Sequence, residues 1–156
     1  MSPTLQSELK KRTPFASVEQ EAALAIMRTS DLIENRLARL FREYGLTSSQ
    51  YNVLRILRGE GKPMPCLDVA ERMIQVAPAI TRVVDQLLKL ELINKTQSTE
   101  DRRVYMVELR PAAKQLLRKM DQPVLHLHAT LMDGVSAKNQ KDLVRVLEKV
   151  RAAIKS

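Results

Sequence analysis

The stretch Ala77–Leu109, which reads APAITRVVDQLLKLELINKTQSTEDRRVYMVEL, decides the fold of this chain. Its first part predicts a helix over 77–89, because apolar residues recur there in steps of three and four. The segment 97–103 is polar and shows no periodicity, so it is predicted to be a loop. The residues 104–109 alternate between two faces and predict a half-buried strand, with 92–96 as its partner. The stretch therefore predicts a helix followed by a β-hairpin.

A helix followed by a two-stranded ribbon with arginines at its tip is typical of a winged helix-turn-helix. Such a helix can enter the major groove of DNA, while the ribbon tip reaches a neighbouring minor groove. Two further helices, separated by the extended segment 63–65, are predicted to complete the unit. Ser48 or Ser49 is expected to cap the first of them. The inward-facing residues of the second are expected to be Leu67, Ala70 and Met73.

The chain ends carry more apolar surface than a unit of this size requires. A long helix over Val18–Tyr44, ended by Gly45, has a narrow, nearly heptad stripe that needs another surface along its length, such as a second subunit. Two more helices are predicted after Pro111, the last one capped by Ser136. We therefore expect the chain ends to form a dimerisation layer.

Three segments with different roles are predicted. Residues 1–45 are expected to form an N-terminal arm and a dimerisation helix, 46–110 the winged helix-turn-helix, and 111–156 C-terminal dimerisation helices. The arm, which holds two prolines and a basic run, is expected to be loosely ordered.

Composition narrows the class of partner. The formal net charge of +8 favours a polyanionic partner, either nucleic acid or an anionic membrane surface. No apolar run approaches the roughly 20 residues that span a bilayer, and the first 15 residues lack the apolar block of a signal peptide. We therefore expect a cytoplasmic protein without a membrane partner. The single cysteine, Cys66, excludes an intrachain disulfide framework and a multi-cysteine zinc site.

Three motifs resemble those of the MarR family, the bacterial multiple-antibiotic-resistance type of regulator. They are Leu46–Leu54 (LTSSQYNVL), Ile80–Leu87 (ITRVVDQL), and Asp101–Arg103 followed by Val107–Leu109. The resemblance covers nearly the whole chain. It implies a mainly α fold with a two-stranded β-wing, in which the N- and C-terminal helices form a dimerisation layer. It also implies that a dimer presents two recognition helices to duplex DNA.

The chain departs from the family pattern at three places. Glu91 stands where the family usually has glycine, and a left-handed conformation there would cost about 1 kcal/mol. Ala113 replaces the glycine that usually follows the wing. The front of the recognition helix, Val76–Ala79, lacks serine and threonine. This argues against base readout by hydrogen bonds at those positions, where small apolar groups can still pack on thymine methyl groups.

The recognition helix and its entrance are expected to supply most of the DNA contacts. The residues predicted to make them are Gln75, Ala77, Pro78, Ala79, Thr81 and Arg82. Arg82 is expected to bind guanine through two hydrogen bonds, the commonest specific contact in the major groove. The alternatives for Arg82 are a phosphate contact or an internal salt bridge with Asp85 or Glu71. Thr81 either donates to a phosphate or serves in capping and packing.

The wing is expected to supply a second group of contacts. Arg103 matches the family's wing arginine, and a guanidinium fits the narrow, electronegative minor groove of A·T-rich DNA. Arg102 and Lys95 are predicted to add contacts, with a solvated turn as the alternative reading of the tip. Phosphate repels a carboxylate, so Asp101 is predicted to orient Arg103 or a second basic side chain.

Other candidate sites are weaker. Cys66 at a helix start is either a thiol whose pKa the helix dipole lowers or, as we favour, a small buried or capping residue. His126 and His128 are two residues apart and face different directions on a helix, so no metal site is expected. No cofactor is expected. The methionines are interpreted as adaptable core, and the family resemblance suggests that some line a ligand crevice.

The expected function is that of a homodimeric, sequence-specific regulator of transcription. It would bind a pseudo-palindromic operator as a repressor, and a small lipophilic or phenolic effector, implied by the family alone, would release it. The alternative is a winged-helix module that binds DNA non-specifically or binds a protein. An enzyme is not expected, because the sequence shows no Ser/His/Asp set, no phosphate-binding glycine loop and no metal cluster.

Overall fold

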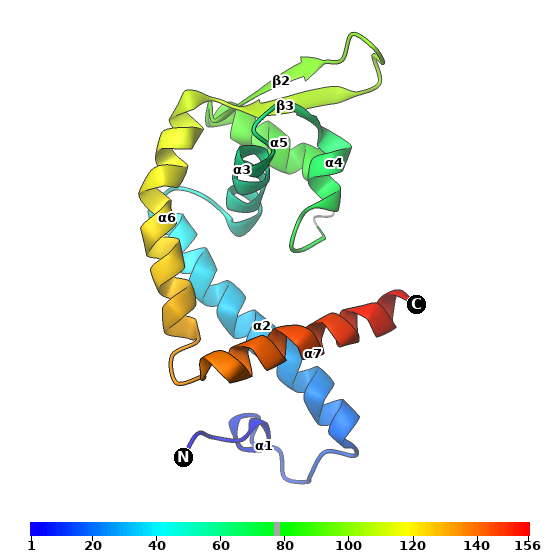
Figure 1. Ribbon diagram of the computed structural model, residues 1–156, viewed down its shortest axis with the longest axis vertical. Coiled ribbons are helices and arrows are strands. Elements are labelled where there is room, and N and C mark those ends of the chain that lie inside the picture. Colours follow the sequence, from blue (N-terminus) through cyan, green and yellow to red (C-terminus); the bar gives the residue numbers. More distant parts are fainter. Residues whose placement is uncertain (77–78) are drawn as a thin grey trace. The chain divides into compact units, whose positions relative to one another are not determined.

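The computed structural model describes residues 1–76 and 79–156, and its elements follow the predicted order (Figure 1). The chain forms two compact units, Met1–Arg118 and Lys119–Ser156. The three predicted segments are defined by their roles in dimerisation and DNA binding, and that assignment of roles stays a prediction. Within the part of the chain that the structure describes, no helix is long and apolar enough to cross a membrane.

The N-terminal region contains two helices. α1 (Leu5–Glu8) is a single turn inside the segment that was predicted to be loosely ordered. It forms because the Thr4 hydroxyl accepts a hydrogen bond from the Ser7 N–H at 3.2 Å, which caps the turn. α2 (Val18–Glu43) agrees with the predicted long helix to within one residue. Gly45 follows it with a φ of 76°, a conformation that glycine adopts without strain.

Thr47 caps α3 (Ser48–Glu60), so the prediction that Ser48 or Ser49 caps this helix is wrong. The Thr47 hydroxyl accepts from the Gln50 N–H at 3.2 Å, and the Gln50 side-chain oxygen accepts from the Thr47 N–H at 3.0 Å. This reciprocal capping box needs a glutamine or glutamate three residues after the cap. Neither Ser48 nor Ser49 has glutamine or glutamate three residues later, so Thr47 caps the helix instead.

The three strands form one antiparallel sheet in the order β1-β3-β2. β2 (Ile93–Gln97) and β3 (Tyr105–Leu109) are the predicted hairpin, with Ile93 opposite Leu109. β1 (Met64–Pro65) pairs with the other edge of β3. This third strand was not predicted, because two residues are too few to show alternation.

α4 (Cys66–Glu71) lies between β1 and the turn that leads to α5. Val69 is its buried residue, with no exposed surface, whereas Leu67 is 72% exposed. The expectation that Leu67 points inward is therefore wrong, while Ala70 and Met73 are half-buried. Six residues make fewer than two helical turns, so periodicity alone does not fix which face meets the core.

An aliphatic core holds the Met1–Arg118 unit together. Its largest fully buried side chains are Val53, Leu54, Val69, Val84, Leu87, Ile93, Val107 and Leu117. The rings of Phe41 and Tyr51 stack with centroids 4.2 Å apart, which joins the end of α2 to α3. α5 (Ile80–Lys89) contributes two residues to this core and is the predicted recognition helix. The first two residues of its predicted range, 77–89, lie outside the described residues.

The chain ends in two long helices. α6 (Pro111–Leu131) continues through Pro123, and Gly134 follows it with a φ of 82°. α7 (Ala137–Lys155) begins after Ser136, whose hydroxyl accepts from the Asn139 N–H at 3.2 Å, as the sequence predicts. α7 has no buried residue.

Candidate nucleic-acid interface

α5 has one face in the core and the other in solvent. Val84 and Leu87 have no exposed surface, and they anchor the helix against the rest of the Met1–Arg118 unit. Thr81, Arg82 and Asp85 are exposed on the same helix. Amphipathic spacing therefore presents the two predicted polar contacts, Thr81 and Arg82, to whatever approaches α5.

The side chain of Arg82 is available for an external partner. Among the residues that the structure describes, Arg82 forms no ion pair with Asp85 or Glu71. The internal salt bridge considered as an alternative for Arg82 is therefore absent from this structure. A guanidinium has five N–H donors in a planar fork, which suits a base edge or a phosphate.

A buried glutamine joins α5 to α3. Gln50 is 7% exposed, and its side-chain nitrogen donates to the side-chain oxygen of Gln86 on α5 at 3.1 Å. Its side-chain oxygen accepts from the Thr47 N–H in the capping box. One buried amide therefore fixes the start of α3 and holds α5 against it. Buried polar groups of this kind require partners, which makes the contact geometrically specific.

A second buried polar side chain holds the turn before α5. The Asn52 side-chain oxygen accepts from the Ile74 N–H at 2.8 Å, and Asn52 is 7% exposed. Neither Gln50 nor Asn52 was predicted from the sequence to be a positioning residue. A signal was present, since both are polar side chains beside the apolar residues Val53 and Leu54 on a short amphipathic helix.

The entrance to α5 carries few polar side chains. Gln75 is exposed, as a DNA contact requires, and Ala79 is exposed at the N-cap position. The predicted contacts Ala77 and Pro78 lie outside the described residues. The roles of these four residues on DNA stay predictions.

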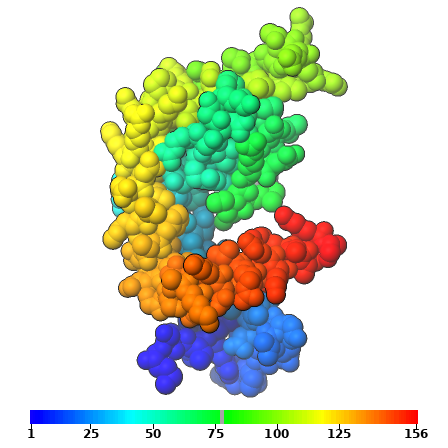
Figure 2. All heavy atoms as spheres, in the orientation of Figure 1, coloured from blue at the N-terminus to red at the C-terminus, as the bar shows by residue number. Residues whose placement is uncertain are grey.

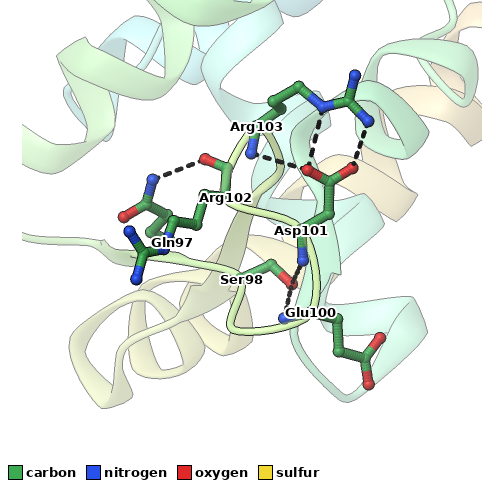
Figure 3. A network of polar contacts seen from close by, with 6 residues as sticks. All are labelled: Gln97, Ser98, Glu100, Asp101, Arg102 and Arg103. Atoms are coloured by element: carbon green, nitrogen blue, oxygen red, sulfur yellow. Dashed lines mark hydrogen bonds and ion pairs between the residues drawn. The ribbon is translucent and has the colours of Figure 1, made fainter.

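The wing tip projects beyond the helices of its unit, as Figure 2 shows in the yellow-green spheres. Backbone hydrogen bonds close the tip, from the Ser98 N–H to the Val104 oxygen at 2.8 Å and from the Val104 N–H to the Asp101 oxygen at 3.0 Å. The Ser98 hydroxyl also accepts from the Glu100 and Asp101 N–H groups, at 3.2 and 3.4 Å. The tip is thus an ordered turn built from its own polar groups (Figure 3).

Asp101 and Arg103 form a two-pronged ion pair at the tip (Figure 3). Arg103 Nε lies 3.2 Å from Asp101 Oδ1, and Arg103 Nη2 lies 3.2 Å from Asp101 Oδ2. The Arg103 N–H donates to the same carboxylate at 3.0 Å. The Arg103 guanidinium and backbone N–H hold the pKa of Asp101 below its ordinary value. The Arg103 side chain nevertheless remains 90% exposed. Asp101 therefore holds Arg103 in one orientation without covering it, which is the geometry expected of an orienting carboxylate.

Two further basic residues of the wing differ in their freedom. The Arg102 side chain is exposed, while its backbone oxygen accepts from the Gln97 side-chain nitrogen at 2.6 Å. The Lys95 ammonium lies 4.6 Å from the centroid of the Tyr105 ring, a cation–π contact across the hairpin. Lys95 is therefore held along the strand, whereas the side chains of Arg102 and Arg103 are exposed at the tip.

Cys66 has the environment of a structural thiol. It is the first residue of α4 and is half-buried. Burial raises the pKa of the Cys66 thiol above its ordinary value, and the positive charge of Lys95 only partly opposes this. A raised pKa disfavours the thiolate that oxidation requires, which argues against the alternative of an activated cysteine. Among the described residues, no group of three His, Cys, Asp or Glu side chains is placed to hold a metal ion.

Comparisons with known proteins agree with this arrangement. The model of the MarR family matches residues 46–105. The chain is 34% identical in sequence to a MarR transcription factor from Planctomyces limnophilus, and it matches the crystal structure of that protein with a TM-score of 0.67. That match covers 86% of this chain and 98% of the other.

Two further proteins extend the comparison. The HTH-type transcriptional regulator PapX of Escherichia coli is 34% identical over 86 residues, which are 53% of this chain and 51% of PapX. The chain thus matches about half the length of this curated relative. Bordetella bronchiseptica BpsR, whose DNA binding is regulated by 6-hydroxynicotinic acid, has a structure with a TM-score of 0.78. It is 19% identical over 89% of this chain and 98% of BpsR, which supports the fold alone.

The predicted mainly α fold with a β-wing is confirmed, and the sheet has a short third strand in addition. With 34% identity to a MarR transcription factor over nearly all of that protein, the chain belongs to the MarR family of transcription regulators.

Proposed function

We propose that this chain binds duplex operator DNA by inserting α5 into the major groove and the wing tip into an adjacent minor groove. One observation carries the proposal. The exposed face of α5 with Thr81 and Arg82, and the exposed arginines 102 and 103 of the wing tip, belong to the same compact unit. In this geometry Arg82 reads a base edge or a phosphate, and Arg103 enters a narrow A·T-rich minor groove.

The proposal includes a homodimer that recognises a pseudo-palindromic operator. Exposed apolar residues on the chain-end helices support it, because a second copy would cover them. They are Leu24, Ile26, Met27 and Leu32 on α2, and Leu143, Val144, Val146 and Ile154 on α7. A two-fold dimer would present two α5 helices, so the half-sites are expected about one helical turn apart.

The proposal assigns the role of a cytoplasmic repressor that competes with polymerase for promoter DNA. A small lipophilic or phenolic effector would release it by binding better to a dimer whose recognition helices are spaced wrongly for DNA. Support comes from the shared fold with BpsR, whose regulator is a hydroxylated aromatic acid. A suitable probe is therefore 6-hydroxynicotinic acid.

The experiment is a salt titration of binding, measured by fluorescence anisotropy. The probe is the DNA upstream of the coding region, and the control is a scrambled duplex of equal length. We expect a nanomolar complex that prefers the upstream DNA by at least about a thousandfold at physiological salt. The alternative result is binding that is equal for both duplexes and steeply salt-dependent. If genomic fragments selected by the protein gave the same result, the non-specific alternative would be established.

Arg103→Ala tests the wing within the same assay. We expect a large loss of affinity, with the dimer intact in sedimentation. The slope of log affinity against log salt should become shallower by about 1 for each phosphate that the variant no longer neutralises. Arg145→Ala is the matched control, because it removes the same charge from α7 and should leave the slope unchanged. Unchanged binding of Arg103→Ala would refute the wing assignment.

A further inference from the structure

Two large aliphatic side chains stand in solvent at the entrance to α5. Ile74 is 81% exposed and Val76 is 93% exposed, although both are residue types that usually lie in protein cores. They occupy the turn between α4 and α5 (Figure 1). By contrast, Val84 and Leu87 further along α5 have no exposed surface. The most exposed large aliphatic side chains of this region thus lie at the entrance to α5.

The turn is held in place by a buried group. The Ile74 N–H donates to the Asn52 side-chain oxygen at 2.8 Å, and Asn52 is 7% exposed on α3. A second buried contact, from Gln50 to Gln86, holds α5 against the same helix. The backbone at Ile74 is thus tied to a buried side chain, while the Ile74 side chain itself is exposed.

The chemistry of this surface limits what it can recognise. Ile74, Val76 and Ala79 have no hydrogen-bonding side-chain group, so they cannot read the donors and acceptors of base edges. The major groove offers one apolar feature to such side chains, the C5 methyl group of thymine. Thr81 and Arg82, exposed on the first turn of α5, supply the polar contacts that would align the helix in the groove.

A protein partner suits this surface less well. A second copy packed symmetrically on the entrance to α5 would bring two Arg82 guanidinium groups toward each other. Among the described residues Arg82 has no ion-pair partner, so their burial would leave like charges uncompensated. DNA provides both the methyl groups for the aliphatic residues and the negative charge for Arg82.

We propose that Ile74 and Val76 are specificity-determining residues that recognise thymine methyl groups in the operator. The inference rests on the proposed function, since it requires that α5 enters the major groove. Removal of one buried methyl group should weaken binding about fourfold, from the usual hydrophobic contribution of such a group. The same change in both half-sites should weaken binding about fifteenfold.

The experiment replaces each operator thymine in turn by deoxyuridine, which pairs identically but lacks the C5 methyl group. Affinity of the unmodified full-length protein is measured by anisotropy at physiological salt. We expect one or two positions per half-site to weaken binding about fourfold each, and the others to have no effect. This measurement needs no variant, so it does not depend on how a substitution affects folding.

Val76→Ala and Ile74→Ala then connect the effect to the side chains. Each variant should bind the thymine operator more weakly and lose its preference for thymine over deoxyuridine at the matching position. Leu90→Ala is the control, because Leu90 is an aliphatic residue, 46% exposed, at the opposite end of α5. It should retain the full preference. Circular dichroism should show all three variants folded.

The outcomes separate this inference from the function on which it rests. Specific operator binding with equal affinity for every thymine and deoxyuridine duplex overturns the methyl readout and leaves the regulator intact. A methyl preference that persists in both alanine variants also overturns the assignment to Ile74 and Val76. Loss of any preference for the operator over a scrambled duplex overturns both proposals together.

Discussion

The winged-helix segment 46–110 and the helix α7 place their apolar side chains in opposite environments. In the former, residues such as Val53, Leu54 and Val107 have no exposed surface. In α7 no residue is buried, and Val144 is 57% exposed. The winged helix therefore has a core of its own, whereas α7 carries an apolar stripe that needs a partner surface. DNA binding is proposed for the first region, and assembly is expected to depend on the second.

The largest expected effect comes from opening the core of the winged helix. Leu54 on α3 has no exposed surface, so Leu54→Ala removes buried methyl groups and leaves a cavity. We expect the free energy of unfolding to fall by about 2–5 kcal/mol in urea denaturation. Leu143→Ala on α7 is the comparison, measured at a concentration low enough to dissociate a dimer. At that concentration, Leu143→Ala should change the free energy of unfolding by less than about 0.5 kcal/mol.

A charge on α7 tests the assembly directly. Val146 is 49% exposed, and Val146→Glu would place a carboxylate in an apolar dimer contact. We expect the dimer dissociation constant to rise at least about a hundredfold, or about 2.7 kcal/mol, in analytical ultracentrifugation. Lys141→Glu is the control, because Lys141 lies on another face of α7. A dimer that tolerates Val146→Glu would show that α7 is not its interface.

Asn52 tests how the winged helix keeps its recognition helix in position. Asn52→Ala leaves the Ile74 N–H without its buried acceptor, which should cost about 1–3 kcal/mol of stability. It should also lower the ratio of operator to scrambled-duplex affinity in protein that is still folded. Thr47→Ala is the matched control, since loss of this cap costs about 1 kcal/mol and leaves the turn before α5 intact. An unchanged affinity ratio in Asn52→Ala would mean that Asn52 only stabilises the fold.

The sequence predicted most of the fold because strong local signals mark its elements. Gly45 and Gly134 follow the ends of α2 and α6 with positive φ, and the alternation in 104–109 marked a strand. The missed features depend on longer-range contacts or on few residues. β1 is defined only by its pairing with β3, and the outward face of Leu67 is set by the packing of Val69. A local pattern does not contain this information.

The site was predictable in outline, but the formal net charge of +8 does not locate it. The segment 46–110 carries ten basic and eight acidic residues, whereas 111–156 carries nine basic and four acidic residues. The overall surplus thus lies mainly outside the winged helix. The candidate interface is marked by the position of its basic residues, since exposed Arg102 and Arg103 lie at the wing tip and exposed Arg82 lies on α5. The anchoring by Asn52 was missed because its partner is a backbone N–H 22 residues away.

The smallest expected effect compares two helix ends that share one hydrogen-bond pattern. After α2, the Leu46 N–H donates to the Phe41 oxygen at 3.1 Å, and Gly45 occupies the left-handed position. After α5, the Leu92 N–H donates to the Leu87 oxygen at 3.1 Å, and the left-handed residue is Glu91. Both ends are Schellman motifs, in which glycine is the favoured residue at this position.

Exchanging the residue at these two positions should change stability in opposite directions. Glu91 has a φ of 57°, so Glu91→Gly should relieve strain and raise the free energy of unfolding by about 1 kcal/mol. Gly45→Ala should lower it by about the same amount, because a Cβ there meets no atom within 4 Å and only the backbone conformation is affected. Glu91→Ala is the control, since it removes the charge and keeps the strain. An equal gain from Glu91→Ala and Glu91→Gly in urea denaturation would assign the effect to the carboxylate instead of the backbone.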